Sequence, residues 1–264
     1  MKQRLDDCLV EHAYAPTLPE ARTLIMTGKV RVNERVVNKA GTLIRPTHDI
    51  IEVKAKAHPY VSRGGVKLAF ALDAFALDVQ GRIALDVGAS TGGFTDCLRQ
   101  AGAACVYAVD VGKHQLHQTL LHDAHVVNWQ GVNGRSLTAE CFPPNARPSI
   151  GVTDVSFVSL RHILPPLCEC LDHTVEAPSW VVALLKPQFE AEYTLSAEEM
   201  KAFNGVITEE SLRQRIKNAT LADLAERLAG WHLAGQAPSP IRGAKGNVEY
   251  VTLWTPYAYG VTPA

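Results

Sequence analysis

The sequence has no hydrophobic run long enough to cross a membrane. A membrane-spanning helix needs about 20 apolar residues, whereas an apolar run such as Trp180–Leu185 is far shorter. Near the N-terminus, Arg4, Asp6 and Asp7 lie where a signal peptide would carry its apolar segment. We therefore expect a soluble, cytoplasmic protein that does not act on a membrane.

Cysteine is scarce, and its spacing does not match the common metal sites. Among the six cysteines, Cys168 and Cys170 lie close together but lack the second pair of ligands that a structural zinc site requires. We expect free thiols and no bound metal. With 264 residues, of which 47% are hydrophobic, the chain can form one large α/β domain plus a small module.

The net charge of −1 is small, but positive charge is gathered at one end of the chain. The first 67 residues hold 12 lysines and arginines against 7 acidic residues, whereas the remaining residues hold 14 against 20. A basic N-terminal part favours a polyanion as its partner. Uneven but solvated surface charge would give the same count, so charge alone leaves the partner open.

Two short helices followed by short strands are predicted for the first 55 residues. Apolar residues at helical spacing indicate a helix within residues 2–13, and Pro19 opens a second helix that stops at Gly28. Alternating apolar residues then predict short strands that turn at Asn33–Glu34 and close at residues 50–53. This order, with TGKVRVN after the second helix, resembles an S4-type RNA-binding domain.

The S4 resemblance implies that basic side chains contact RNA phosphates, which gives affinity without reading the base sequence. The chain departs from the S4 pattern at Leu18–Pro19, where a serine and an arginine are usual, and at Glu34, where a glycine is common. The RNA-binding candidates are Arg4, Arg22, Lys29, Arg31, Lys39 and, further along, Arg63.

A buried strand that ends in a glycine-rich turn is the clearest motif. Residues 83–85 run into DVGASTGGF at residues 86–94, which is typical of the first unit of a nucleotide-binding α/β fold. The full glycine pattern of a dinucleotide-binding turn is absent, because Ser90 replaces its second glycine and Asp86 precedes the turn. An acid and free backbone N–H groups suit the ammonium and carboxylate of S-adenosylmethionine better than a pyrophosphate.

A second acid supports this cofactor. Asp110 ends the next predicted strand, about where an acid binds ribose hydroxyls. Asn133 and Arg135 follow the third predicted strand, and either is a candidate for the adenine pocket or simply part of a loop. The cofactor-binding candidates are Asp86, Gly88, Ser90, Thr91, Gly92, Gly93, Phe94, Asp110, Val111, Asn133 and Asp154.

Two lysines and two acidic residues lie near the ends of predicted helices and strands. A ribose 2′-hydroxyl is a weak acid, and a lysine held among carboxylates and a second lysine can remove its proton. The candidates are Lys67 in a predicted helix 65–75, Asp154 and Lys186 after predicted strands, and Glu249 in a late strand that begins at Gly246. Asp154 is not followed by the two prolines usual in methyltransferases that act on exocyclic base nitrogens.

Five motifs follow one another behind the S4-like module: YVSRGGVKL, LDVGASTGGFTDCL, DVSF, LLKPQFE and SPIRGAKGNVEY. In this order they resemble the TlyA-type proteins, also called the hemolysin A family, which are FtsJ-like ribosomal RNA 2′-O-methyltransferases. The resemblance implies a catalytic tetrad of Lys67, Asp154, Lys186 and Glu249, with Lys186 as the base. It also implies S-adenosylmethionine as cofactor, and ribosomal RNA or ribosomal subunits as partner, with cytidine as the target.

We therefore predict an α/β fold. Its main part is a Rossmann-like class I methyltransferase sheet of seven mostly parallel strands with helices on both faces, including an amphipathic helix at 208–230. The N-terminal part is a small α+β S4-like module. The predicted boundaries are 1–57 for the S4-like domain, 58–64 for a linker, 65–258 for the methyltransferase domain and 259–264 for a tail.

Three other functions stay open at this point. The basic module disfavours a methyltransferase for a small molecule. The tetrad disfavours an RNA-binding protein whose cofactor fold has lost catalysis. A membrane-damaging cytolysin, as the older family name suggests, would need a spanning or strongly amphipathic membrane segment, and none is evident in the sequence.

Overall fold

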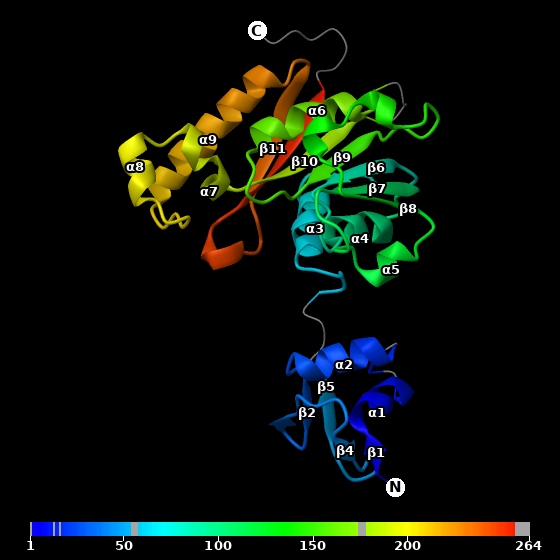
Figure 1. The fold of residues 1–264 in the computed structure, drawn as a ribbon. Helices are drawn as coiled ribbons and strands as arrows, with labels where there is room; N and C mark the ends of the chain where they lie inside the picture. The colour runs from blue at the N-terminus through cyan, green and yellow to red at the C-terminus, as the bar shows by residue number, and fades with distance from the viewer. Residues whose placement is uncertain (1, 13, 16, 54–57, 174–177, 257–264) are drawn as a thin grey trace. The chain divides into compact units, whose positions relative to one another are not determined.

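The chain divides into two compact units, Met1–Pro59 and Tyr60–Ala264. The computed structural model describes residues 2–12, 14–15, 17–53, 58–173 and 178–256 (Figure 1). The predicted boundary at residue 57 and the predicted tail 259–264 lie outside the described residues. Tyr60 packs against the apolar core of the second unit, and the Val61 amide donates to the Asp96 carboxylate at 2.7 Å.

The first unit is a small α+β module. Its core is made of side chains that the helical spacing placed inward, and Leu5, Leu9, Ala21 and Ile25 have no exposed surface. Helix α2 begins where the Thr17 hydroxyl accepts a hydrogen bond from the Glu20 amide. The elements are α1 (Leu5–Glu11), α2 (Leu18–Met26), an antiparallel sheet of β3 (Arg35–Val36), β2 (Val30–Val32) and β5 (Ile51–Val53), and the pair β1 (Gln3–Arg4) and β4 (Leu43–Ile44).

The backbone of the turn between β2 and β3 explains why a glycine is common in S4 domains at the position of Glu34. Asn33 and Glu34 both have left-handed backbone, with φ of 49° and 64°. The Asn33 side chain stabilises the turn, because it donates to Asp49 and accepts from the Ile50 amide, both at 2.9 Å. Glu34 adopts the same backbone region, at a conformational cost of about 1 kcal/mol that a glycine would avoid.

The second unit is built on a seven-stranded sheet. Strand β12 is antiparallel to both of its neighbours, and the other neighbouring pairs are parallel. This arrangement confirms the predicted α/β class and the mostly parallel sheet. The strand order across the sheet is β11 (Trp231–Pro238), β12 (Tyr250–Pro256), β10 (Trp180–Leu185), β9 (Ile150–Thr153), β6 (Ile83–Val87), β7 (Cys105–Asp110) and β8 (Val126–Gln130).

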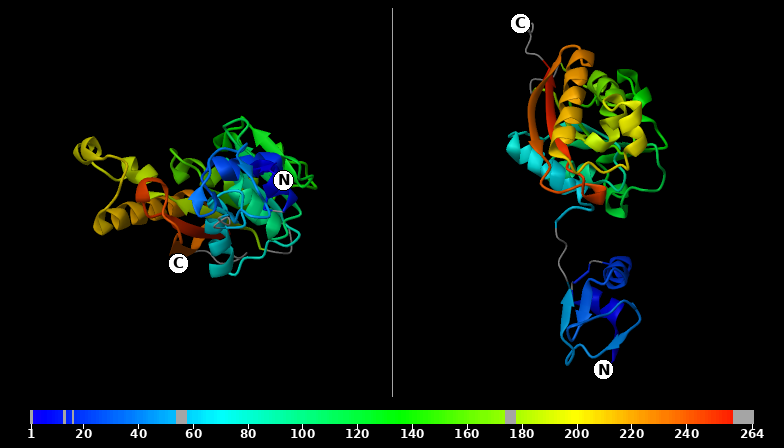
Figure 2. Two further views of the ribbon diagram at one scale, coloured as in Figure 1. Left: turned by 90° about the horizontal axis from the view of Figure 1, so that it is seen from below. Right: turned by 90° about the vertical axis from the view of Figure 1, so that its left-hand side faces the viewer.

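Helices cover both faces of this sheet (Figures 1 and 2). One face carries α3 (Gly64–Ala74), α4 (Gly93–Gln100) and α5 (Gln118–Leu121), and the other carries α6 (Leu164–Cys170) and α9 (Glu210–Arg227). Because both faces are covered, β10 is an uninterrupted run of buried side chains. Among the described residues of this unit, the remaining helices are α7 (Pro187–Glu190), α8 (Ala197–Ala202) and five 3₁₀ turns at Gly134–Ser136, Ala139–Cys141, Leu160–His162, Ala191–Tyr193 and Ala244–Gly246.

The last strand begins later than the sequence predicted. The alternation of GNVEYV favoured a strand from Gly246, but β12 starts at Tyr250. Residues before it form a turn in which Lys245 and Gly246 have φ of 57° and 83°. The Asn247 side chain anchors this turn by donating to the Gly205 carbonyl and accepting from the Ile207 amide. Glu249 consequently lies at the end of a loop, directly before the strand.

Candidate active site

The glycine-rich turn after β6 folds as it does because its backbone is left-handed at several positions. Gly88, Ser90 and Gly92 have φ of 86°, 50° and 92°. A Cβ on Gly88 would lie 2.7 Å from the Val155 side chain, so this position has room only for glycine. The turn brings β6 against the loop after β9, at the point where the strand order reverses and α/β folds bind their ligands.

A cavity of about 580 Å³ opens at the carboxyl ends of β6, β7 and β9. Six of the predicted cofactor-binding residues line it: Gly88, Ser90, Asp110, Val111, Asn133 and Asp154. Arg135, the other candidate after the third strand, lines it as well. These residues come from different motifs in the sequence, and the fold of the sheet brings them together at one edge.

The Asp110 carboxylate lies at one side of this cavity in a fixed orientation. One oxygen accepts from the Ser90 amide at 2.8 Å and the other from the Gly112 amide at 2.7 Å. Each carboxylate oxygen can accept a further hydrogen bond, so Asp110 can bind the two hydroxyls of a ribose. The neighbouring Val111 is 74% exposed and offers an apolar surface to an adenine ring. The lining therefore fits an adenosyl group.

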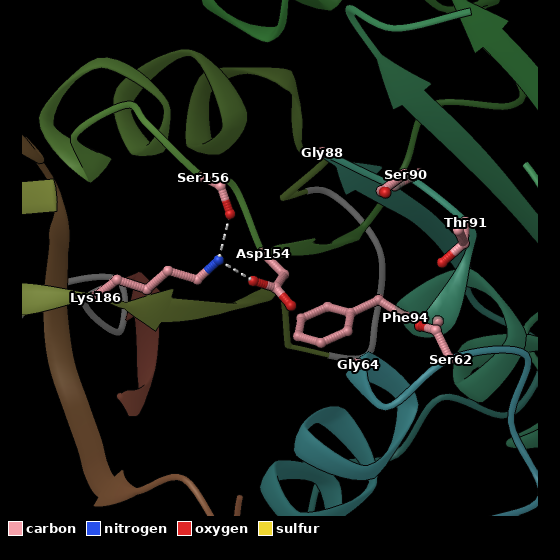
Figure 3. A pocket seen from close by; sticks show the side chains of 11 residues that line it. Ser62, Gly64, Gly88, Ser90, Thr91, Phe94, Asp154, Ser156 and Lys186 are labelled. Carbon is pink, nitrogen blue, oxygen red and sulfur yellow. Dashed lines mark hydrogen bonds and ion pairs between the residues drawn. The ribbon is translucent and has the colours of Figure 1, made fainter. Parts of the chain in front are cut away.

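A smaller cavity of about 190 Å³ adjoins the first, and the two share Gly88, Ser90, Asp154 and Ser156. Figure 3 shows its lining from the glycine turn, the start of α3 and the end of β10. Three further predicted cofactor-binding residues, Thr91, Gly93 and Phe94, lie here. The Lys186 ammonium points toward Asp154 and Ser156 at its edge.

The four residues of the predicted tetrad form one row of alternating charges. The Lys67 ammonium lies 2.6 Å from a Glu249 carboxylate oxygen and 3.6 Å from Asp154. The Lys186 ammonium lies 2.6 Å from the other Asp154 oxygen, and it donates to the Ser156 hydroxyl at 2.9 Å. The row therefore runs from Glu249 through Lys67 and Asp154 to Lys186.

Burial gives this row its electrostatic importance. Lys67, Lys186 and Glu249 are 8%, 7% and 3% exposed. An unpaired charge at such a depth costs several kcal/mol, and pairing with an opposite charge offsets that cost. Two positive and two negative side chains balance here, so each charge holds its neighbours in place.

Two predicted cofactor residues do not line either cavity. Gly92 is the N-cap residue directly before α4, and a Cβ there would collide with Leu116 and Leu120. Asp86 is fully buried and accepts a hydrogen bond from the Thr95 hydroxyl at 2.6 Å. Burial raises the pKa of Asp86 to about 7. Gly92 and Asp86 therefore contribute to the structure of the turn and do not line the cavities.

The six predicted RNA-binding residues are exposed, and some have structural partners as well. The Arg4 and Arg22 guanidiniums both contact the buried Asp6 carboxylate, at 2.8 and 3.0 Å. The hydrogen bond from Arg4 is the main cause that lowers the pKa of Asp6 to about 2. Arg63 donates to the Arg242 carbonyl at 2.9 Å. The other three are Lys29, Arg31 and Lys39.

Several residues that line the cavities were not predicted, among them two serines and a phenylalanine. Ser62 and Ser156 line the smaller cavity. Phe157 lines the larger cavity, is 90% exposed and has a φ of 64°. Both Ser156 and Phe157 belong to the DVSF motif, but their roles depend on a strained loop conformation that a residue pattern does not reveal.

Neither a metal site nor a membrane span was found in the described parts of the chain. No group of three histidine, cysteine or acidic side chains there is arranged to hold a metal ion. None of the helices in those parts is long and apolar enough to cross a bilayer.

The raised pKa of Asp86 predicts a pH dependence of stability. Between about pH 4 and pH 7 the folded protein keeps a proton on Asp86 that the unfolded chain loses. The contribution of Asp86 to stability is therefore greatest near pH 4 and is lost as the pH rises to about 7. Asp86→Asn removes this titration, so its stability relative to the wild type should rise through that window. Urea unfolding of both proteins measures this, and a constant difference would contradict the assignment.

Comparison with known proteins identifies the family. The model of FtsJ-like methyltransferases matches residues 60–255, and the S4 domain model matches residues 3–51. The chain is 40% identical over 253 residues to a 16S/23S rRNA (cytidine-2′-O)-methyltransferase TlyA from Mycobacterium tuberculosis, covering 96% of this chain and 89% of the relative.

Two further similarities cover nearly the whole chain. It is 39% identical over 248 residues to Hemolysin A from Brachyspira hyodysenteriae, covering 94% of this chain and 98% of the relative. A solved structure of a candidate hemolysin from Streptococcus thermophilus superposes with a TM-score of 0.69 at 36% identity, covering 97% of this chain and 88% of that one. The prediction from the ordered motifs is confirmed: the chain belongs to the FtsJ-like methyltransferase family, in its TlyA-type branch with an N-terminal S4 domain.

Proposed function

We propose that this enzyme methylates the ribose 2′-hydroxyl of a cytidine in ribosomal RNA, with S-adenosylmethionine as methyl donor and Lys186 as base. The row of paired charges from Glu249 to Lys186, in which Asp154 lines both cavities and Lys186 lines the smaller one, carries the proposal. The relative from Mycobacterium tuberculosis is named for this reaction on ribosomal RNA. Such an enzyme acts where ribosomes are, so we propose a cytoplasmic location.

The larger cavity would hold the cofactor. Asp110 would bind the ribose hydroxyls, Val111 and Asn133 would flank the adenine, and the turn from Gly88 to Phe94 would face the amino-acid end. When bound there, S-adenosylmethionine supplies an electrophilic methyl group on a positively charged sulfur. Asp154 lines both cavities, so the reacting hydroxyl would lie beside it.

Lys186 would take the proton of the 2′-hydroxyl at Nζ after its ammonium has released one proton to solvent. Asp154 and Ser156 hold that nitrogen at 2.6 and 2.9 Å, which fixes the direction from which it receives the proton. Lys67, fixed by Glu249, would orient the ribose and balance the charge of Asp154. The chain thus supplies a positioned base and charge balance, which are effective in a site that excludes water.

The surroundings of Lys186 suit a nucleotide. Phe157 presents an exposed ring at the edge of the larger cavity, packed against Phe189 at a centroid distance of 5.0 Å. An exposed aromatic ring can stack on a base that has been turned out of an RNA strand. Arg63, at the start of α3, would contact a phosphate of the same strand.

The first unit would supply most of the RNA affinity. Lys29, Arg31 and Lys39 are exposed on one small module, together with the guanidiniums of Arg4 and Arg22. Contacts of this kind bind phosphates without reading bases. We assign RNA anchoring to the first unit and methyl transfer to the second.

Replacing Lys186 tests the catalytic role. Lys186→Met keeps the length of the side chain and removes the amine, and we expect methyl transfer to ribosomal subunits to fall by about 10²- to 10⁴-fold. Transfer of labelled methyl from S-adenosylmethionine measures this, with Lys201→Met on the exposed α8 as the matched control.

The outcomes separate the possible functions. Equal transfer by Lys186→Met and the wild type would remove Lys186 as the base. No transfer by the wild type, combined with tight RNA binding, would favour an RNA-binding protein whose cofactor fold has lost catalysis.

Salt dependence tests the RNA-binding role of the first unit. Removing two phosphate contacts with Lys29→Ala and Arg31→Ala should weaken RNA binding and lower the slope of log affinity against log salt by about 1.5. Titration of RNA at several salt concentrations measures the slope. Lys201→Ala should leave it unchanged, and an unchanged slope in the double variant would remove these two residues from the RNA interface.

A further inference from the structure

Two chain segments carry the residues around the proposed base, and they contact each other at successive positions. The first is the loop after β9, which holds Asp154, Ser156 and Phe157. The second follows β10 and consists of Lys186 and helix α7, which holds Phe189. Lys186 contacts Asp154 and Ser156, and the Phe189 ring contacts that of Phe157. These contacts set the position of the lysine relative to the exposed aromatic ring.

A buried carboxylate, that of Glu190, binds the end of the β9 loop that lies farther from Lys186. Glu190 is 1% exposed and ends α7, four residues after Lys186. One of its oxygens accepts from the Ser159 hydroxyl and from Arg161, both at 2.6 Å. The other accepts from the Leu160 backbone amide at 2.7 Å. Glu190 thus holds the far end of the first loop, whose near end holds Lys186.

Two hydrogen bonds join these two segments at both ends and so form a closed circuit of chain and contacts. Lys186 donates to Ser156 at one end, and Ser159 donates to Glu190 at the other. The loop connects Ser156 to Ser159, and α7 connects Lys186 to Glu190. Phe157 lies in the loop part of this circuit, and its backbone is left-handed, with a φ of 64°. A strained conformation of this kind persists only where the surrounding contacts enforce it.

We propose that Glu190 is a positioning residue for the methyl-transfer site, fixing the loop of Ser156 and Phe157 relative to Lys186. The inference rests on the proposed function of Lys186 as base. Without the carboxylate, the Ser159 hydroxyl and the Leu160 amide are left buried without their acceptor, and the loop moves to recover hydrogen bonds. A displacement of about 1 Å in a reacting group can lower a rate by about 10²-fold.

Asp223 offers a matched control in the same charge network. It contacts the Arg161 Nε at 2.7 Å from α9, whereas Glu190 contacts a different nitrogen of the guanidinium. It also pairs with Arg227 one turn further along the helix. Glu190→Ala and Asp223→Ala therefore each remove one carboxylate partner of Arg161, but only Glu190 has hydrogen bonds to Ser159 and Leu160.

The test combines single-turnover methyl transfer with hydrogen exchange in the full-length protein. For Glu190→Ala we expect the single-turnover rate to fall about 100-fold, with the dissociation constant of S-adenosylmethionine changed by less than about threefold. Asp223→Ala should keep its rate within about threefold of the wild type, because that carboxylate is partly exposed. The Leu160 amide should exchange faster in Glu190→Ala and at the wild-type rate in Asp223→Ala.

Equal losses of rate in the two variants would overturn the proposal, since they would reflect a general destabilisation of the Arg161 network. A wild-type rate in Glu190→Ala would also overturn it. If that variant does not fold, Glu190→Gln replaces it, and a rate equal to that of Asp223→Ala overturns the proposal. If the wild type itself transfers no methyl group, the proposed function fails, whereas Leu160 exchange still decides whether Glu190 holds the loop.

Discussion

The candidate active site depends on the pairing of three buried charges with a fourth, Asp154, that is partly exposed. Glu249, Lys67, Asp154 and Lys186 alternate in sign, and each ammonium lies between oxygen atoms that hold it. A buried charge without a partner costs more than most single contacts in a protein contribute, so the row can exist only as a whole. The same pairing that makes the burial tolerable also orients Lys186 toward the junction of the two cavities. Stability and proposed catalysis thus rest on one set of contacts.

The fold brings these charges together from four distant segments. Asp154 and Lys186 follow parallel strands and therefore lie at the same edge of the sheet. Lys67 comes from the first turns of α3, and Glu249 comes from the loop that Asn247 anchors before the antiparallel strand. The glycine turn after β6 is left-handed at several positions, which lets Val155 approach and brings the larger cavity next to the charged row. Glu190 also contributes to this arrangement, because it accepts hydrogen bonds from the loop that follows Asp154.

Much of this was predictable from the sequence, because the strongest signals are local. The strand and turn from Ile83 to Phe94 predicted a segment that lines the two cavities, and the order of the motifs predicted the family and the sheet. The start of the last strand was predicted wrongly, because a left-handed turn at Lys245–Gly246 interrupts an alternating pattern. The role of Phe157 was also missed, since phenylalanine usually indicates burial and only the loop conformation exposes it. That Asp86 lies behind the cavity, and that Glu190 faces Ser159, depends on packing between segments far apart in the sequence.

The chemical position of the transferred methyl group tests the proposed reaction most directly. Ribosomal RNA methylated by the purified protein would be cleaved with alkali and analysed by mass spectrometry. Methylation of a 2′-oxygen blocks alkaline cleavage at that nucleotide, because the oxygen can no longer attack the neighbouring phosphate. We expect one alkali-resistant dinucleotide whose methyl group lies on the ribose of a cytidine. A methyl group on a base nitrogen or carbon would contradict it, because the row ending in Lys186 would then not act on a ribose hydroxyl.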